Sequence, residues 1–130
     1  MALEKEIELE NGIILNYHRI TSLNKITNEL NNIEINSYIN ENQRNKEKEY
    51  QNLQKENMQL QEDLNKENLS EENREKLLEK NNKMNEELEK GINVLIESEF
   101  IQIPYDEDMT IEDAYDFLKT LEKYKNSKNI

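Results

Sequence analysis

The side chains that most often perform chemistry in proteins are sparse in this sequence. His18 is the only histidine, and there is no cysteine. His18 lies in a segment of strand-like alternation with no serine, cysteine or aspartate motif beside it. We therefore expect a structural histidine rather than a catalytic base. Without cysteine, disulfides and thiolate metal sites are excluded.

Two groups of carboxylates have a spacing that could bind a cation or a basic partner. Residues 106–108 (Asp-Glu-Asp) offer consecutive oxygen ligands, but they lack the spacing and the glycine of a calcium loop, so we interpret them as a solvated loop before a helix. The alternate glutamates of residues 4–10 share one side of a strand, which either faces solvent or meets a basic partner. Phosphate-loop, dinucleotide, nucleophile-elbow and zinc-helix motifs are absent. We predict no catalytic, metal or cofactor site, and a protein that is not an enzyme.

Composition limits the fold and the partners. Hydrophobic residues make up 34% of the 130-residue chain and charged residues 35%, which allows a small core with an extension. The net charge of -12 is spread evenly and no Lys/Arg cluster interrupts it, so nucleic acid and anionic membranes are disfavoured as partners. No apolar run approaches the roughly 20 residues that span a bilayer. The first ten residues also lack the apolar core of a signal peptide.

The first element predicted from periodicity is a β-hairpin in KEIELENGIILNYHRI, which alternates around Asn11-Gly12. A two-residue turn would mix apolar and polar faces. A three-residue loop over residues 10–12, with Gly12 in the left-handed conformation, gives one apolar face. The side chains on that face would be Ile7, Leu9, Ile13, Leu15 and Tyr17.

More strands and a helix are predicted at both ends of the chain. Alternation over residues 33–39 indicates a third strand, and residues 92–103 indicate another that Pro104 ends. Thr110 and Asp113 form a capping box at the start of a helix. Its apolar face would comprise Ile111, Ala114 or Tyr115, Leu118 and Leu121. We therefore predict a small β-rich docking domain from residues 1–40 and 91–122, followed by a polar tail, residues 123–130.

Residues 41–90 form the charged middle of the chain, where apolar residues recur in two short heptad seams of different phase. Charged residues at the continuing seam positions, 67–74, argue against one unbroken rod. Ser70 is placed to cap a second helix, and Gly91 to end it. Folding the chain about residue 69 brings the seams together, so we predict an inserted antiparallel coiled-coil hairpin.

The seam residues are our candidates for interaction and assembly: Tyr50, Leu53, Asn57, Leu60, Leu64, Leu77, Asn81, Met84 and Leu88. This folding about residue 69, called the mirror below, pairs Tyr50 with Leu88 and Asn57 with Asn81. Only ten of residues 41–90 are hydrophobic, so the seam is thin and self-association could support it. Alternatively, three parallel copies of residues 50–64 would place Asn57 on a shared axis. The predicted fold class is α+β, with an antiparallel sheet from both chain ends, this hairpin and a short C-terminal helix.

Two stretches together resemble a known group of proteins. IELENGIILNYHRITSLNKIT and IPYDEDMTIEDAYDFLKTL are similar to segments of small tail- and baseplate-associated structural proteins of phages and prophages of low-GC Gram-positive bacteria. The resemblance covers roughly residues 3–50 and 92–122. Residues 50–90 depart from it, because such proteins often have a short linker there.

The resemblance implies a non-enzymatic part of a tail, baseplate or fibre attachment. It would be present in several copies as a homo-oligomer, bound to other phage tail or baseplate proteins, and located in the virion after assembly in the host cytoplasm. It implies no catalytic residues. Two other functions share the acidic charge and coiled-coil surface: a tail or fibre assembly chaperone absent from the finished particle, and an acidic regulatory binding protein such as an anti-repressor.

Overall fold

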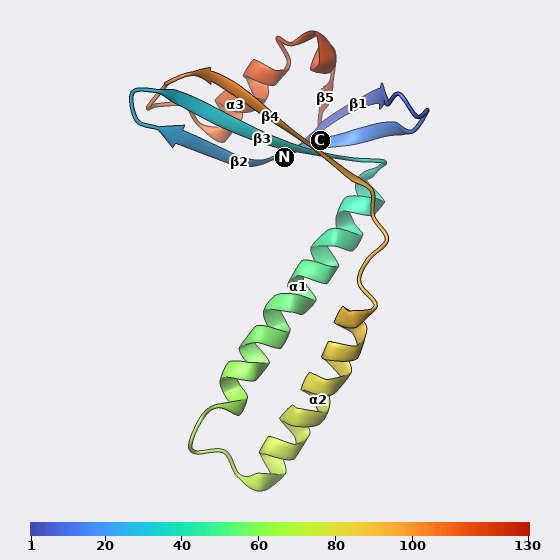
Figure 1. Ribbon diagram of the computed structural model, residues 1–130, viewed down its shortest axis with the longest axis vertical. Helices are drawn as coiled ribbons and strands as arrows, with labels where there is room; N and C mark the ends of the chain where they lie inside the picture. The colour runs from blue at the N-terminus through green and yellow to red at the C-terminus, as the bar shows by residue number, and fades with distance from the viewer. The chain divides into compact units, whose positions relative to one another are not determined.

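The computed structural model describes residues 1–130, which divide into two compact units. The sheet unit is Met1–Arg44 with Leu95–Ile130, and the hairpin unit is Asn45–Val94. The predicted α+β class is confirmed: a five-stranded antiparallel sheet, two helices packed together and a short helix near the C-terminus (Figure 1). None of the helices combines the length and the apolar character that crossing a bilayer requires.

The sheet has the strand order β4-β3-β2-β1-β5, with every pair of neighbours antiparallel. Its strands are β1 (Leu3–Glu8), β2 (Ile14–Ile26), β3 (Leu30–Tyr38), β4 (Ile96–Pro104) and β5 (Lys128–Asn129). The strand predicted over residues 92–103 therefore begins four residues later and ends at Pro104 as expected. Segments from both ends of the chain meet in this one sheet.

The turn between β1 and β2 has the predicted three-residue form. Ile7 pairs with Leu15, and the Gly12 N–H donates to the Leu9 carbonyl oxygen at 2.9 Å. Gly12 has φ +86°, a conformation that costs a side-chain-bearing residue free energy. The Asn11 side-chain oxygen accepts from the Ile13 N–H at 3.1 Å, so both residues of the predicted turn have a local structural role.

Ile7 and Leu15 line a recess together with His18, whereas Tyr17, which was predicted on their face, does not line it. A register shift between Glu4 and Ile7 inserts an extra residue into β1, so Tyr17 pairs with Glu4. His18 then pairs with Leu3, and cross-strand partners share a face. His18 therefore shares a face with Leu3 of the buried core.

Helix α3 (Ile111–Leu118) contributes to the core that the sheet buries. Thr110 and Asp113 form the predicted capping box, with each side chain accepting from the other residue's backbone N–H. Ala114, Tyr115 and Leu118 are buried as predicted, whereas Ile111, which was predicted on the same face, is exposed. The Tyr115 hydroxyl accepts from the Ile20 N–H and donates to the Met1 carbonyl, which ties the helix to β2 and the N-terminus.

The predicted polar tail, residues 123–130, is instead part of the sheet unit. Tyr124 follows in a 3-10 turn, η1 (Glu122–Tyr124), and its side chain is fully buried. Strand β5 then pairs with β1, and Ala2 and Ile130 exchange two backbone hydrogen bonds of 2.9 Å. The prediction failed because these strand residues are polar and only pairing with β1 makes them a strand.

The hairpin unit contains most of the two longer helices, α1 (Glu41–Leu64) and α2 (Glu71–Glu89), joined by residues 65–70. Ser70 caps α2 as predicted, accepting from the Asn73 N–H at 3.2 Å. Gly91 follows α2 in the left-handed conformation, with φ +63°. Arg74, which the heptad pattern marks only as a charge that breaks the seam, donates to the carbonyls of Leu64 and Lys66. It thus satisfies the carbonyl of Leu64 at the end of α1 and one in the connecting segment.

Candidate interaction site

All nine predicted seam residues lie on the inner side of the hairpin. Asn57, Leu60 and Met84 are buried, with 6%, 6% and 9% of their surface exposed. The other six are half-buried, in a unit whose remaining side chains are mostly exposed: Tyr50, Leu53, Leu64, Leu77, Asn81 and Leu88. The apolar positions of α1 and α2 therefore face each other, as the heptad spacing predicts.

One end of the seam has the predicted contact between Tyr50 and Leu88. The Tyr50 hydroxyl donates to the Leu88 carbonyl at 3.0 Å. That carbonyl lies in the last turn of α2 and also accepts from the Gly91 N–H at 3.1 Å. Tyr50 therefore both packs in the seam and caps the end of the opposite helix.

The middle of the seam is shifted from the predicted mirror by about one helical turn. Asn57 donates from its side-chain amide to the Asn85 side-chain oxygen at 2.8 Å, and Asn85 lies one turn beyond the predicted partner Asn81. The side-chain oxygens of Asn57 and Asn81 are buried without a hydrogen-bond partner. The seam is therefore held by a polar layer that is only partly satisfied.

A recess of about 290 Å³ lies beside Leu60, for which folding about residue 69 predicted Leu77 as partner. Leu60 lines this recess together with Met84 from the other helix. Charged side chains form its rim, among them Asp63 and Lys80. The Asp63 carboxylate accepts from Lys66 and Gln59, and these hydrogen bonds lower its pKa.

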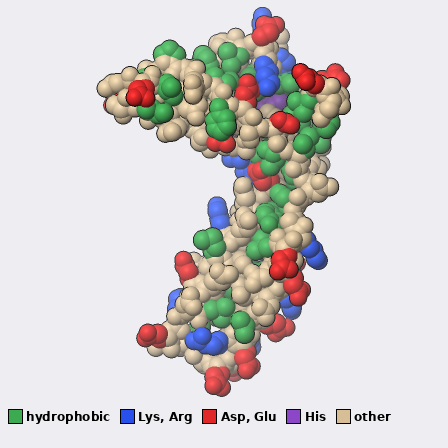
Figure 2. Space-filling model, viewed as in Figure 1, with side chains coloured by type: hydrophobic (Ala, Val, Ile, Leu, Met, Phe, Trp, Pro, Cys, Tyr) green, Lys and Arg blue, Asp and Glu red, His purple; other side chains and the backbone are tan.

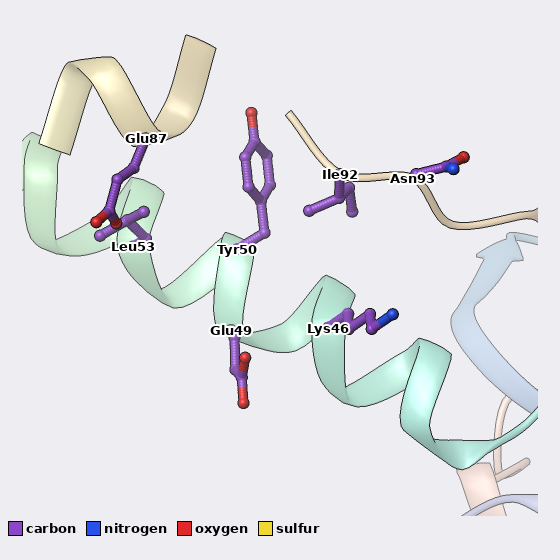
Figure 3. Close-up of a pocket in the computed structure, with 7 residues that line it drawn as sticks. All are labelled: Lys46, Glu49, Tyr50, Leu53, Glu87, Ile92 and Asn93. Carbon is purple, nitrogen blue, oxygen red and sulfur yellow. The ribbon is translucent and has the colours of Figure 1, made fainter. Parts of the chain in front are cut away.

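A larger groove, of about 450 Å³, opens beside Tyr50 and Leu53 near the ends of the hairpin unit (Figure 3). Both side chains project from α1, while Ile92 projects from the segment that follows α2. Ile92 is 41% exposed, so its apolar surface is available to a partner. The other lining residues of the groove are polar or charged: Lys46, Glu49, Glu87 and Asn93. The groove combines an apolar floor with charged groups of both signs.

The outer surface of the hairpin differs from this groove. Acidic and basic side chains are interspersed along the face seen in Figure 2. Some form exposed i,i+4 pairs, such as Glu72–Lys76 and Glu79–Lys83, both at 3.5 Å. Exposed pairs of this kind stabilise a helix by only about 0.3–0.5 kcal/mol each. For the groove beside Tyr50, sequence reasoning proposed Tyr50 and Leu53 but missed Lys46, Glu49 and Ile92, which lie outside the two predicted stretches of seam.

The sheet unit holds a buried polar cluster around His18, which is 1% exposed. The two ring nitrogens each lie 2.7 Å from an oxygen, Nε2 from the Lys5 carbonyl and Nδ1 from the Ser37 hydroxyl. Because a carbonyl only accepts, Nε2 carries the proton in the neutral ring and Ser37 donates to Nδ1. Burial lowers the pKa of His18, and the hydrogen bond to Lys5 partly offsets this effect. His18 is therefore neutral at pH 7.

Glu99 and Tyr124 lie beside this histidine. The Tyr124 ring meets the His18 ring edge-on at 5.5 Å, and its hydroxyl donates to Glu99 at 2.8 Å. Burial raises the pKa of Tyr124, and the hydrogen bond to Glu99 adds to the rise. Burial would also raise the pKa of Glu99, but hydrogen bonds from Lys123 and Tyr124 outweigh it and hold that pKa below its usual value.

A recess of about 290 Å³ adjoins the His18 cluster. Its apolar wall comprises Ile7, Leu9 and Leu15, and its polar wall includes Ser37 and Glu99. Alternation alone could not reveal this cluster, because it joins residues from five separate segments of the chain. His18 was the one member that the sequence singled out.

Comparisons with protein-family models, with curated proteins and with solved structures found no match to this chain.

Proposed function

We propose that the protein is a non-enzymatic structural component of a phage tail, baseplate or fibre-attachment assembly. In this proposal the sheet unit binds a neighbouring tail or baseplate protein. The helical hairpin packs against other copies of the chain or against a second partner. The protein would act by joining surfaces, and it would reside in the particle after assembly in the host cytoplasm.

The observation that carries the proposal is where the phage-like segments fall in the fold. They cover roughly residues 3–50 and 92–122, and the sheet unit comprises residues 1–44 and 95–130. Residues 50–90, which depart from the resemblance, belong to the hairpin unit. This coincidence is what we expect when an existing domain receives an inserted element, because each part keeps its own core.

The groove beside Tyr50 supports the packing role of the hairpin. Its apolar floor and its rim with charges of both signs resemble the general composition of protein–protein interfaces, in which a desolvated centre is surrounded by polar groups. Tyrosine is also enriched among residues that dominate binding free energy. The exposed Ile92 would gain most from burial by a partner.

The test is mass spectrometry of intact phage particles, or phage-tail-like particles, purified from the bacterium that encodes the chain. We expect its peptides in the purified particles in a constant ratio to the major tail protein, across gradient fractions. A chain abundant in the lysate but absent from intact particles would overturn the proposal and favour the assembly chaperone. Co-purification with a DNA-binding protein, without particles, would overturn it in favour of the regulatory binding protein.

A further inference from the structure

Strand β4 forms one edge of the sheet and has β3 as its sole hydrogen-bonded neighbour (Figure 1). The strand is nine residues long, and its pairing with β3 runs without a register shift from Leu30–Pro104 to Tyr38–Ile96. The opposite edge is β5, which has only two residues. The sheet therefore has one long and regular edge, whose outward backbone groups can pair with another strand.

Natural proteins usually protect such an edge with lysines, prolines, bulges or inward-pointing charges. Strand β4 contains no lysine and no bulge, and its proline stands at the last position. Glu97 and Glu99 lie on the inward face, since they pair with Ser37 and Ile35. The Glu99 carboxylate is already bound by Lys123 and Tyr124, each at 2.8 Å. Because the charge of Glu99 is already paired within the sheet unit, it repels an incoming strand less strongly.

Phe100 lies at the midpoint of β4 and is 61% exposed. Its neighbours Ile101 and Ile103 pack against the core. Because side chains alternate along a strand, Phe100 lies on the other face, together with Ser98 and Gln102. A large aromatic side chain thus lies at the centre of an unpaired edge, with polar residues two positions away on either side of it.

We propose that two copies of the chain join through β4, pairing antiparallel about a two-fold axis at Phe100. This register uses the whole strand, because Phe100 is its middle residue. It places Glu97 opposite Ile103 and Glu99 opposite Ile101, so no two carboxylates oppose each other. An axis at Glu99 would oppose the two Glu99 side chains, and an axis at Ser98 would oppose Glu97 and Glu99. The charge pattern of β4 therefore selects the register centred on Phe100.

The contact joins two five-stranded sheets into one continuous sheet. Across the axis the two Phe100 rings contact each other, and aromatic cross-strand pairs are favourable. Electrostatic repulsion between the two copies opposes the contact. In each copy, residues 1–44 and 95–130 carry 16 acidic and 8 basic side chains, which gives a formal charge of -8. Since salt screens repulsion between exposed charges, association through β4 strengthens as salt concentration rises. The contact concerns the sheet unit alone and stands whether or not the chain belongs to a phage particle.

The absence of native cysteine allows a direct test with Phe100→Cys in the full chain. In an antiparallel pair, opposite Cα atoms lie about 4.5–5.5 Å apart, and disulfides form at Cα separations of about 4.4–6.8 Å. Oxidised glutathione should convert Phe100→Cys into a covalent dimer, seen on a non-reducing gel. The matched control is Asn24→Cys, an exposed position on the same face but on β2, which should stay monomeric. A monomeric Phe100→Cys, or equal cross-linking of both variants, would overturn the proposal.

A second measurement uses the uncross-linked protein. Light scattering over a range of concentration and salt should show wild-type dimers that increase with salt. Phe100→Lys should abolish them, because it places two ammonium groups on the axis, whereas Asn24→Lys should not. Since Phe100 is exposed, both variants should retain the wild-type circular dichroism spectrum. A wild type that is monomeric throughout, or a dimer that persists in Phe100→Lys, would contradict pairing through β4.

Discussion

His18 shows how a single residue can be fixed by the fold on every side. Its ring nitrogens bind Lys5 and Ser37, and its ring meets Tyr124. The sequence indicated a structural histidine from the lack of a neighbouring motif. Its partners were not predictable, because a bulge in β1 and a buried C-terminal tyrosine bring them together. Neither feature leaves a signal in local periodicity.

The lowered pKa of His18 predicts a loss of stability in mild acid. Because burial lowers the folded pKa, the unfolded chain binds a proton first as pH falls, so the contribution is present above pH ~6.5 and lost below it. Nearby Lys123 and Lys5 act in the same direction, whereas Glu99 opposes them. Urea unfolding at pH 8, 7, 6 and 5 should show the loss in wild type.

The control for this prediction is His18→Gln, which cannot titrate. Its stability should be lower at pH 8 but should change less between pH 7 and 5 than that of wild type. The depressed pKa of Glu99 acts in a separate window, since its contribution is present above the usual carboxyl pKa of ~4.3 and lost at lower pH. Equal pH dependence of both proteins between pH 7 and 5 would contradict the assignment to His18.

At the scale of elements, the local signals in the sequence predicted most of what the structure shows. The predicted turn and cap residues have the predicted roles. Gly12 and Gly91 adopt left-handed conformations, and Ser70 and Thr110 cap the helices that follow them. These signals succeed because a cap or a left-handed turn is decided within a few residues. Strand β5 and the bulge in β1 were missed because each depends on a partner strand distant in sequence.

The hairpin seam was predictable in position but not in register. Heptad spacing identifies which residues face inward, but antiparallel helices can slide by a turn without changing that set. The Asn57–Asn85 hydrogen bond, rather than the mirror about residue 69, defines the alignment in the middle of the seam. The alignment leaves the side-chain oxygen of Asn57 buried and without a partner.

That orphan oxygen predicts the effect of Asn57→Leu on the hairpin. Burying an unsatisfied polar group costs about 1–3 kcal/mol, and leucine would replace it with apolar contact. We expect the free energy of unfolding to rise by about 1 kcal/mol, since loss of the hydrogen bond to Asn85 offsets part of the gain. Thermal unfolding followed by circular dichroism at 222 nm measures the change, and light scattering reports any change in mass.

The matched control is Asn52→Leu, the same substitution at an exposed position of α1. Its stability should stay within about 0.5 kcal/mol of wild type, as is usual for surface substitutions. A change in mass with Asn57→Leu would favour a seam shared between copies, the alternative of three parallel helices. No change in mass or stability would mean that Asn57 does not lie on a buried seam.

At the scale of the whole molecule, the sheet unit has its own core, and this predicts that it folds without the hairpin. Its buried cluster contains side chains from β1, β2, β3, α3 and η1, and none from residues 45–94. Replacing residues 45–94 by a flexible linker of about ten glycine and serine residues should therefore give a β-rich protein that unfolds cooperatively. Near-ultraviolet circular dichroism and urea unfolding would test this.

The complementary fragment, residues 45–94 alone, should be only partly helical. Its seam is thin, and isolated helical segments with little apolar burial are marginal in water. A fully helical and cooperative hairpin peptide would contradict this expectation, and failure of the linker variant to fold would show that the sheet unit needs the hairpin. The division into units was predictable from composition, because the apolar alternation stops where the charged middle begins.

The hydrogen bonds between Ala2 and Ile130 have a consequence for the order in which the chain is synthesised. Strand β5 cannot pair with β1 until residue 129 has been synthesised. The outer side of β1 therefore stays without a hydrogen-bonded strand until the rest of the sheet has been made. During synthesis β1 is a temporary sheet edge. The outer side of β1 is therefore unpaired in the nascent chain, although it pairs with β5 in the folded protein. The alternate glutamates of β1 would repel another strand of like charge during that time.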